Sequence, residues 1–246
     1  MPNSPASTLH PISVIISASE EWRAVLEYFD HPEVSRTPFG GLFSREFDSS
    51  TLTFMHGGWG KISAAASAQY LLDVCPADLL INLGTCGGLD GRIGRGQVLL
   101  AGETLVYDIE ERMGDPAEAI AHYSTRLNLS WLKQPYPRNV VCARLLSADR
   151  DLDPGQIQWL EETFNAVAVD WESGAIAWVA LRSNTPCLIL RGVTDLVSNK
   201  GGEAYDGITF FQQSARQIMF SLLDDLPEWL AGIDWEALHQ TRKPLR

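Results

Sequence analysis

Residues 168–195 read AVDWESGAIAWVALRSNTPCLILRGVTD and predict a strand–helix–strand unit. Two apolar strands end in acidic residues, the first at Glu172 and the second at Asp195, and a stretch with helical character runs between them from Gly174 to Arg182. If the two strands are parallel, both carboxylates lie at the carboxyl edge of the sheet, where open α/β sheets bind small ligands. Two carboxylates at that edge can divide the work of cleaving a glycosidic bond.

The rest of the chain continues this alternation of apolar strands and helices. Leu79–Leu83 and Val140–Leu146 are predicted strands, and Glu203–Leu223 is a predicted long amphipathic helix. Strands that are apolar throughout indicate a sheet covered on both faces. The expected fold class is therefore α/β: a single-domain, three-layer α/β/α arrangement around a central twisted mixed, mostly parallel sheet. Residues 12–246 are expected to form this domain, behind a flexible N-terminal tail of residues 1–11.

Shorter segments complete this expectation. Leu42–Phe47 and Thr51–His56 alternate apolar and polar residues and predict a β-hairpin, and Gln97–Ala101 and Thr104–Tyr107 are expected to be two further strands. Residues 109–137 show no clear period and carry several prolines, so we expect helix fragments and loop there. Such a segment can form a mobile cover or a contact with another subunit.

Composition limits the partners of this chain. Its 246 residues are 45% hydrophobic, its formal net charge is −12 and its pI is about 4.8. A nucleic-acid backbone requires a basic face and an anionic membrane surface attracts basic segments, so neither partner is expected. No apolar run approaches the roughly 20 residues of a membrane span, and the four cysteines lack paired spacing, so a reduced, cytoplasmic protein is expected. The five histidines show no spacing typical of a metal site, and no metal is expected.

Two glycine clusters follow predicted strands, at residues 57–61 (GGWGK) and 84–88 (GTCGG). Glycine permits positive φ and lets a ligand approach the backbone closely, although a pair of tight turns is the alternative interpretation. Neither cluster matches the phosphate-binding loop or the dinucleotide fingerprint, so nucleotide phosphates are not implied.

The acidic residues also have plainer explanations. Asp170 and Glu172 precede a helix, where capping and the helix dipole favour acids. Asp195 is compatible with a turn, and Arg191, inside an apolar strand, requires a partner that a structural salt bridge would supply.

In this order, the segments resemble the purine nucleoside phosphorylase/uridine phosphorylase superfamily, and within it the 5′-methylthioadenosine/S-adenosylhomocysteine nucleosidase branch. The resemblance covers most of the chain from about residue 12 to 220. It rests on IISASEE at 15–21, GWGK at 58–61, INLGTCGGL at 81–89, LSAD at 146–149, VDWE at 169–172 and RGVTD at 191–195.

The resemblance implies a role for each matching residue. Asp195 would donate a proton to N7 of a purine and so improve the leaving group. Glu172 would accept hydrogen bonds from the ribose hydroxyls, and these contacts tighten as the sugar becomes cationic. Further substrate-binding residues implied by the match lie beside ribose and base, beside the acid or beneath the sugar: Thr85, Cys86, Gly87, Asp151, Trp171, Arg191 and Thr194.

The resemblance also indicates the nucleophile. Related phosphorylases place a phosphate-binding arginine where this chain has Asn82, as the nucleosidases do, so water is favoured over phosphate. The nucleosidases activate that water with a glutamate four residues after an alanine, and counting from Ala18 this position is Trp22. A one-residue adjustment of the loop would let Glu21 serve, whereas the alternative leaves Glu20 and Glu21 as solvated acids of a first helical turn. Asp151 stands where the family has an aromatic residue that stacks on adenine. The sequence therefore specifies the reaction class better than it specifies the base of the substrate.

Together these features predict a nucleosidase that hydrolyses the N-glycosidic bond of a purine nucleoside, with a 5′-modified adenosine as the expected substrate and no metal or organic cofactor. The resemblance further implies a homo-oligomer, dimeric or hexameric, in which residues 103–125 contribute to a neighbouring site. One alternative is a phosphorylase that recruits Arg23, Arg45 or Arg92 for phosphate. Another is a nucleoside-binding homologue without catalysis. Trp22 and Asp151, which depart from the family pattern, favour this second alternative.

Overall fold

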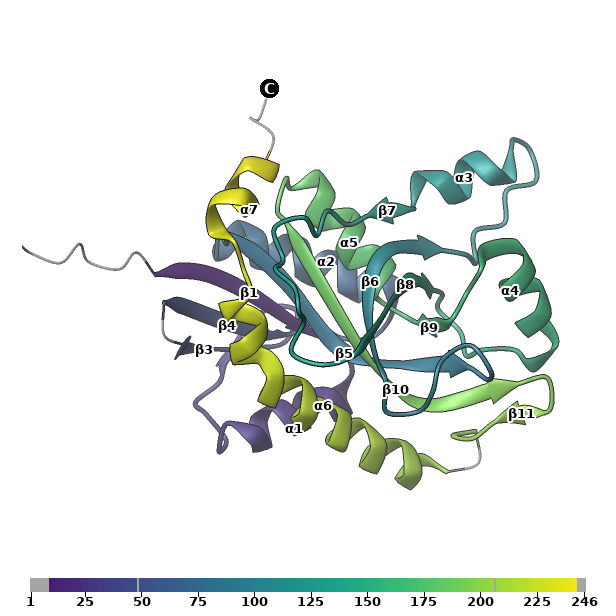
Figure 1. Ribbon diagram of the computed structural model, residues 1–246, viewed down its shortest axis with the longest axis horizontal. Helices are drawn as coiled ribbons and strands as arrows, with labels where there is room; N and C mark the ends of the chain where they lie inside the picture. The colour runs from purple at the N-terminus through teal and green to yellow at the C-terminus, as the bar shows by residue number, and fades with distance from the viewer. Residues whose placement is uncertain (1–8, 48, 206, 243–246) are drawn as a thin grey trace, which may run out of the picture.

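The computed structural model describes residues 9–47, 49–205 and 207–242. Its helices and strands follow one another as Figure 1 shows. The strands are β1 (His10–Ile16), β2 (Ser35–Arg36), β3 (Gly41–Phe47), β4 (Ser50–His56), β5 (Leu79–Leu89), β6 (Val98–Val106), β7 (Thr125–Arg126), β8 (Val140–Ser147), β9 (Ala168–Asp170), β10 (Cys187–Ser198) and β11 (Gly201–Gly202). The helices are α1 (Ser19–Tyr28), α2 (Gly60–Val74), α3 (Pro116–His122), α4 (Ile157–Phe164), α5 (Ser173–Arg182), α6 (Ile208–Ala231) and α7 (Trp235–Thr241).

The strands form one mixed sheet that closes on itself over part of its width. β4, β1, β5 and β10 run parallel as neighbours, and β3 and β2 extend the β4 side. Beyond β10 the order continues through β6, β8 and β9, and β9 pairs again with β5, so five strands make a closed ring. Closure is possible because β5 is long: its first half pairs with β1, and its last residues pair with β9.

Helices cover both faces of the sheet, which confirms the three-layer α/β/α expectation. Figure 1 shows α1 and α6 on one side and α2 and α5 on the other. Val25 of α1 and Met219 of α6 pack in one buried apolar cluster with the sheet, and Leu71 of α2 and Ile176 of α5 pack in a second. A third cluster places α4 against the closed part of the sheet. No helix among the described residues is long and apolar enough to cross a membrane.

The strand that ends in the second glycine cluster is longer than expected. β5 does not stop at Leu83 but continues through the GTCGG stretch to Leu89, so these glycines are strand residues and not a turn. At Gly84 the reason is a close approach: a Cβ there would lie 1.8 Å from Nη1 of Arg191. The first cluster is a turn, since Gly58 and Gly60 have φ of 77° and 75° and lead into α2.

The unit at residues 168–195 has the predicted elements but not the predicted direction. β9, α5 and β10 are all present, yet β9 is antiparallel to β5 while β10 is parallel to it. The two strands therefore do not form a parallel pair. Their acidic ends reach one region because β9 and β10 flank the same extended strand, β5.

Three boundaries also differ from expectation. β1 begins at His10, so two residues of the expected tail belong to the sheet, whereas residues 1–8 lie outside the described ranges. The two strands expected at 97–107 are a single strand, β6, with a bulge between Ala101 and Glu103. The long helix begins at Ile208, because Gly201–Gly202 first folds back on β10 as β11, and it continues to Ala231.

Two other expectations are confirmed. β3 and β4 form the predicted hairpin. Residues 109–137 contain the short helix α3 and the two-residue strand β7 between loops.

Candidate active site

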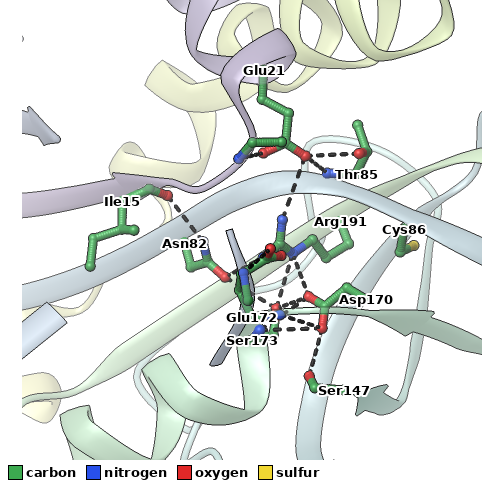
Figure 2. A network of polar contacts seen from close by, with 12 residues as sticks. Ile15, Glu21, Asn82, Thr85, Cys86, Ser147, Asp170, Glu172, Ser173 and Arg191 are labelled. Carbon is green, nitrogen blue, oxygen red and sulfur yellow. Dashed lines mark hydrogen bonds and ion pairs between the residues drawn. The ribbon is translucent and has the colours of Figure 1, made fainter. Parts of the chain in front are cut away.

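A buried guanidinium lies at the centre of the candidate site. Arg191, in the middle of β10, has no exposed side-chain surface. Its Nε lies 3.0 Å from Oδ2 of Asp170 and 3.0 Å from Oγ of Ser173, and its Nη2 donates to Oδ1 of Asn82 at 2.8 Å. Figure 2 shows these groups converging on Arg191. Removing such a charge from water is costly, and this fixed set of acceptors offsets that cost.

Asn82 therefore holds the arginine. Its carbonyl oxygen accepts from Arg191 and from Ser173, and its amide donates to the carbonyl of Ile15 at 3.0 Å. Asn82 of β5 thus connects β1 and β10 through hydrogen bonds to Ile15 and Arg191.

Glu21 is buried in this network and is not a solvated acid. It is 2% exposed, and its Oε1 accepts from the backbone N–H of Thr85 at 2.6 Å and from its hydroxyl at 2.8 Å. The second oxygen accepts from the N–H of Ala18 at 3.1 Å, which caps the first turn of α1. The alternative in which both first-turn acids are solvated is therefore wrong for Glu21.

The neighbouring residues explain why Glu21 and not residue 22 faces the site. Trp22 is 7% exposed and packs in the core, stacked on His56 with ring centroids 5.6 Å apart. Glu20 points away and pairs with Arg23 and Gln212. Of Glu20, Glu21 and Trp22, it is therefore Glu21 that joins the Arg191 network.

One donor of the guanidinium stays available to the site. Nη1 of Arg191 lies 3.8 Å from Oε1 of Glu21 and has no hydrogen-bond partner within residues 9–47, 49–205 and 207–242. An unpaired buried donor costs about 1–3 kcal/mol, and the nearest acceptor to this one is the Glu21 carboxylate.

Glu172 links the first glycine turn to the network. It is the N-cap of α5, and its Oε1 accepts from the N–H of Gly60 at 3.1 Å. Its Oε2 lies 4.0 Å from Nη2 of Arg191. Burial, followed by the nearby Asp170 carboxylate, raises the pKa of Glu172 to about 8, although Arg191 opposes the shift.

Asp170, for which the sequence indicates a helix cap, also belongs to the Arg191 network. It does cap α5, because it accepts from the N–H of Ser173 at 3.2 Å. It also accepts from the hydroxyl of Ser147 at 2.6 Å and carries the charge that Arg191 needs. An arginine inside an apolar strand indicates that an acidic partner exists. That partner, Asp170, is 21 residues away along the chain from Arg191, and residue spacing alone does not identify it.

Asp195 lies where β10 loses its regular register. Val193 pairs with Cys86 and Asp195 with Gly87, so Thr194 is the extra residue of a bulge. The hydroxyl of Thr194 donates to Oδ1 of Asp195 at 2.7 Å. Asp195 is 7% exposed, and burial raises its pKa, with the Glu203 and Asp151 carboxylates acting in the same direction and Thr194 against it. These conditions favour the protonated form of Asp195 more than the surroundings of an exposed aspartate do.

The remaining predicted residues surround these acids. Thr85, Cys86 and Gly87 are in β5, and the buried Cys86 thiol has a pKa raised by desolvation, so it is not a ready nucleophile. Trp171 is half-buried between β9 and α5, and Asp151 is exposed after β8. The sequence interpretation missed Tyr205, whose hydroxyl donates to the carbonyl of Leu152 beside Asp151.

The rim beside Glu172 carries a second charged group that the sequence did not predict. Lys61 pairs with Asp108 and lies 3.5 Å from Oδ2 of Asp149. The N–H of Lys61 also donates to Asp149 at 2.8 Å, and the N–H of Asp149 donates to Asp108 at 3.0 Å. These contacts fix the start of α2 against the ends of β6 and β8. They thereby support the hydrogen bond from the N–H of Gly60 to Glu172.

The protein thus combines a partly closed mixed sheet with buried acids on α1, β9 and β10 and at the start of α5. The chain belongs to the phosphorylase superfamily, whose family model matches residues 11–227. Among the curated relatives, the 5′-methylthioadenosine/S-adenosylhomocysteine nucleosidase of Maridesulfovibrio salexigens is 27% identical over 205 residues, which cover 78% of this chain and 89% of that protein. The nucleosidase of the same name from Anoxybacillus flavithermus is 25% identical over 215 residues, covering 82% of this chain and 91% of the relative.

Solved structures agree on the fold. The 5′-methylthioadenosine/S-adenosylhomocysteine nucleosidase of S. pneumoniae, with the transition-state inhibitor MT-ImmA, superposes with a TM-score of 0.71 at 20% identity, covering 90% of this chain and 99% of that one. A futalosine hydrolase mutant of Helicobacter pylori superposes with a TM-score of 0.74 at 16% identity, covering 89% of this chain and 99% of that one. The nucleoside phosphorylase-like α/β fold is therefore shown.

Proposed function

We propose that this protein is an N-ribosyl hydrolase that cleaves the glycosidic bond of a purine nucleoside, with a 5′-modified adenosine such as methylthioadenosine or S-adenosylhomocysteine as substrate. The observation that carries the proposal is the placement of Glu21, which is buried against Thr85 and within 3.8 Å of Arg191. The names of the curated relatives support the substrate class.

The proposed reaction uses three carboxyl groups. Protonated Asp195 donates to N7 of the purine while the bond between C1′ and the base nitrogen breaks, and the bonding electrons leave with the base. Glu172 hydrogen-bonds the ribose hydroxyls and stabilises the sugar as it gains positive charge. Glu21 accepts a proton from a water molecule whose oxygen forms the new bond to C1′.

Charge at the nucleophile position supports water over phosphate. The Arg191 guanidinium already has Asp170 beside it and Glu21 close by. A phosphate dianion at this position would meet two carboxylates in a low-dielectric environment, which is strongly unfavourable. Water carries no charge and can donate to Glu21 while it accepts from Arg191.

The arginines of the phosphorylase alternative do not reach this network in the structure. Arg23 pairs with Glu20, Arg45 donates to the carbonyl of Ser44, and Arg92 donates to Asn165. This arrangement favours the hydrolase proposal.

We further propose that the protein is a homo-oligomer in which the segment around α3 reaches a neighbouring copy. α3 contributes no buried residue to its own chain, and Met113 just before it is 97% exposed. Analytical ultracentrifugation tests this proposal: a dimer or larger assembly is expected, and a monomer at micromolar concentration would contradict it.

The deciding experiment is base release, followed by chromatography, in phosphate-free buffer and again with phosphate. The nucleosides are methylthioadenosine, S-adenosylhomocysteine, adenosine, inosine and uridine. Release of adenine from the 5′-modified adenosines without phosphate is the expected result. Release that requires phosphate would establish a phosphorylase, and tight nucleoside binding without any base release would support a non-catalytic binding protein.

A further inference from the structure

A group of possible metal ligands lies at the end of the sheet opposite the candidate active site. His10 begins β1, Asp78 lies just before β5, and His239 is in α7. Nδ1 of His10 is 3.2 Å from Oδ2 of Asp78, and Nε2 of His239 is 3.5 Å from Oδ1 of the same carboxylate. One ligand atom from each residue lies within 4.8 Å of the other two.

These separations are close to those of a coordination sphere. In a tetrahedral zinc site with bonds of about 2.1 Å, neighbouring ligand atoms are roughly 3.4 Å apart. Nδ1 of His10 and Oδ2 of Asp78 already have this spacing, and Nε2 of His239 lies 3.5 Å from the other oxygen of the same carboxylate, so a small shift of the His239 ring would complete the set. Two imidazoles and one carboxylate are donors that Zn²⁺ and similar transition metals prefer, whereas Mg²⁺ and Ca²⁺ prefer sites built from oxygen alone. We propose that His10, Asp78 and His239 bind one divalent transition-metal ion, for which Zn²⁺ is the fitting choice, with water as the remaining ligand.

The surroundings of the three residues support a defined site. The ring of Trp235 stacks on His10 with centroids 3.8 Å apart and planes 3° from parallel, which fixes the orientation of the imidazole. Arg242 donates to the carbonyl of Ala77, and its Nη1 lies 3.5 Å from Oδ1 of Asp78. Outer contacts of this kind orient ligating side chains in metal sites.

Arg242 is also the competitor for the metal. Its positive charge beside Asp78 lowers the affinity of the carboxylate for a second cation, and without a metal the same residues make an ion-pair cluster around Asp78. In the proposed site, Arg242 keeps Oδ1 while the metal takes Oδ2. Replacing Arg242 with glutamine is therefore expected to tighten metal binding, whereas an ion-pair cluster alone predicts no such gain.

The location indicates a structural role for the metal. The three ligands come from near both ends of the described chain and from the start of β5, so an ion would clamp α7 onto the sheet. The acids of the candidate active site lie toward the other ends of β5 and β10. Metal binding is thus expected to raise the melting temperature, and this effect does not depend on the proposed activity. Any nucleoside turnover should be the same with and without the metal.

The test uses untagged, full-length protein that has been treated with a chelator and dialysed. Zn²⁺ is titrated by calorimetry, and melting temperatures are measured with and without the ion. We expect one equivalent to bind, a rise in melting temperature, and at least a tenfold weaker affinity in both His239→Ala and His239→Gln. His122→Ala, on exposed α3, and Cys142→Ser, at an exposed cysteine, are the matched controls and should bind as the wild type does.

Three results would overturn the proposal: no saturable binding at micromolar Zn²⁺, unchanged affinity in the two His239 variants, or loss of binding in either control. Because His239 is partly exposed on a short terminal helix, both of its variants are expected to fold, and their melting temperatures without metal verify this.

Discussion

Oε1 of Glu21 lies 3.8 Å from Nη1 of Arg191, and both side chains are almost completely buried. The glutamate comes from the first turn of α1, and the arginine comes from the middle of β10, 170 residues later. Thr85 of β5 holds the glutamate through two hydrogen bonds, and Asn82 of the same strand holds the arginine. The central strand therefore holds both the carboxylate and the guanidinium in place.

The first prediction concerns the water base. Glu21→Gln is expected to lower kcat by about 10²–10⁴-fold, because an amide cannot accept the proton of the attacking water. Glu20→Gln is the matched control, since its carboxylate pairs with Arg23 outside the network, and it should retain nearly full activity. Steady-state kinetics of base release measure both variants. Equal activity in the two would remove Glu21 from the proposed mechanism.

The second prediction concerns the proton donor. Asp195→Asn should abolish turnover while the circular dichroism spectrum stays unchanged, because the asparagine fills the same space but has no acidic proton. A loss of about 10²-fold or more in kcat is expected. Asp90→Asn, at an exposed position after β5, is the control. Full activity of Asp195→Asn would contradict the acid role.

The third prediction uses the bulged residue beside that acid. Thr194 donates to Asp195 and lowers its pKa, so Thr194→Val should raise the pKa of Asp195 further. If turnover requires protonated Asp195, the alkaline limb of the kcat profile moves to higher pH in this variant. A limb that does not move, or that moves to lower pH, would show that a different group limits the rate.

The fourth prediction concerns stability and pH. The pKa of Glu172 rises from 4.5 to about 8 on folding, so the folded state binds more protons than the unfolded state between these values. The free energy of unfolding therefore falls as pH rises through this window. Glu172→Gln removes the titrating group and should flatten that fall, so the variant gains stability relative to the wild type at pH 8 and above.

Chemical denaturation at a series of pH values measures this effect. A wild-type stability that rises between pH 5 and 8, while that of the variant stays flat, would contradict the expected direction of the change.

The fifth prediction concerns the glycine opposite the arginine. A Cβ at Gly84 would lie 1.8 Å from Nη1 of Arg191, whose side chain is fully buried. Gly84→Ala should therefore displace Arg191, destabilise the protein by about 1–3 kcal/mol and reduce activity. Gly102→Ala is the matched control, because a Cβ at this strand position meets no atom of the described residues within 4 Å. Similar unfolding free energies for the two variants would mean that Arg191 moves aside readily.

Local patterns identified much of the fold. Apolar runs located β5, β8 and β10, alternation located the β3–β4 hairpin, and the acids before α5 marked its start. These features can be recognised because burial and capping act over a few residues. The family resemblance rested on the same short segments, and the family model confirms it.

The direction and the boundaries of the strands were harder to predict from the sequence. The acidic ends of β9 and β10 were expected on parallel neighbours, but β9 runs antiparallel to the extended end of β5. That arrangement depends on pairings between residues about 80 positions apart, which no local pattern encodes. The same long-range pairing extended β5 through glycines that looked like a turn.

The layers of the fold and the residue types of the site could be predicted from the amino-acid sequence, because hydrophobic period and the chemistry of Glu172, Arg191 and Asp195 are properties of short segments. The folded chain was needed to show that Glu21, and not the residue at position 22, meets Arg191, and that Asp170 neutralises the arginine. It was needed equally to bring His10, Asp78 and His239 together. Such contacts join distant segments, and they follow from how the sheet closes and how the helices pack on it.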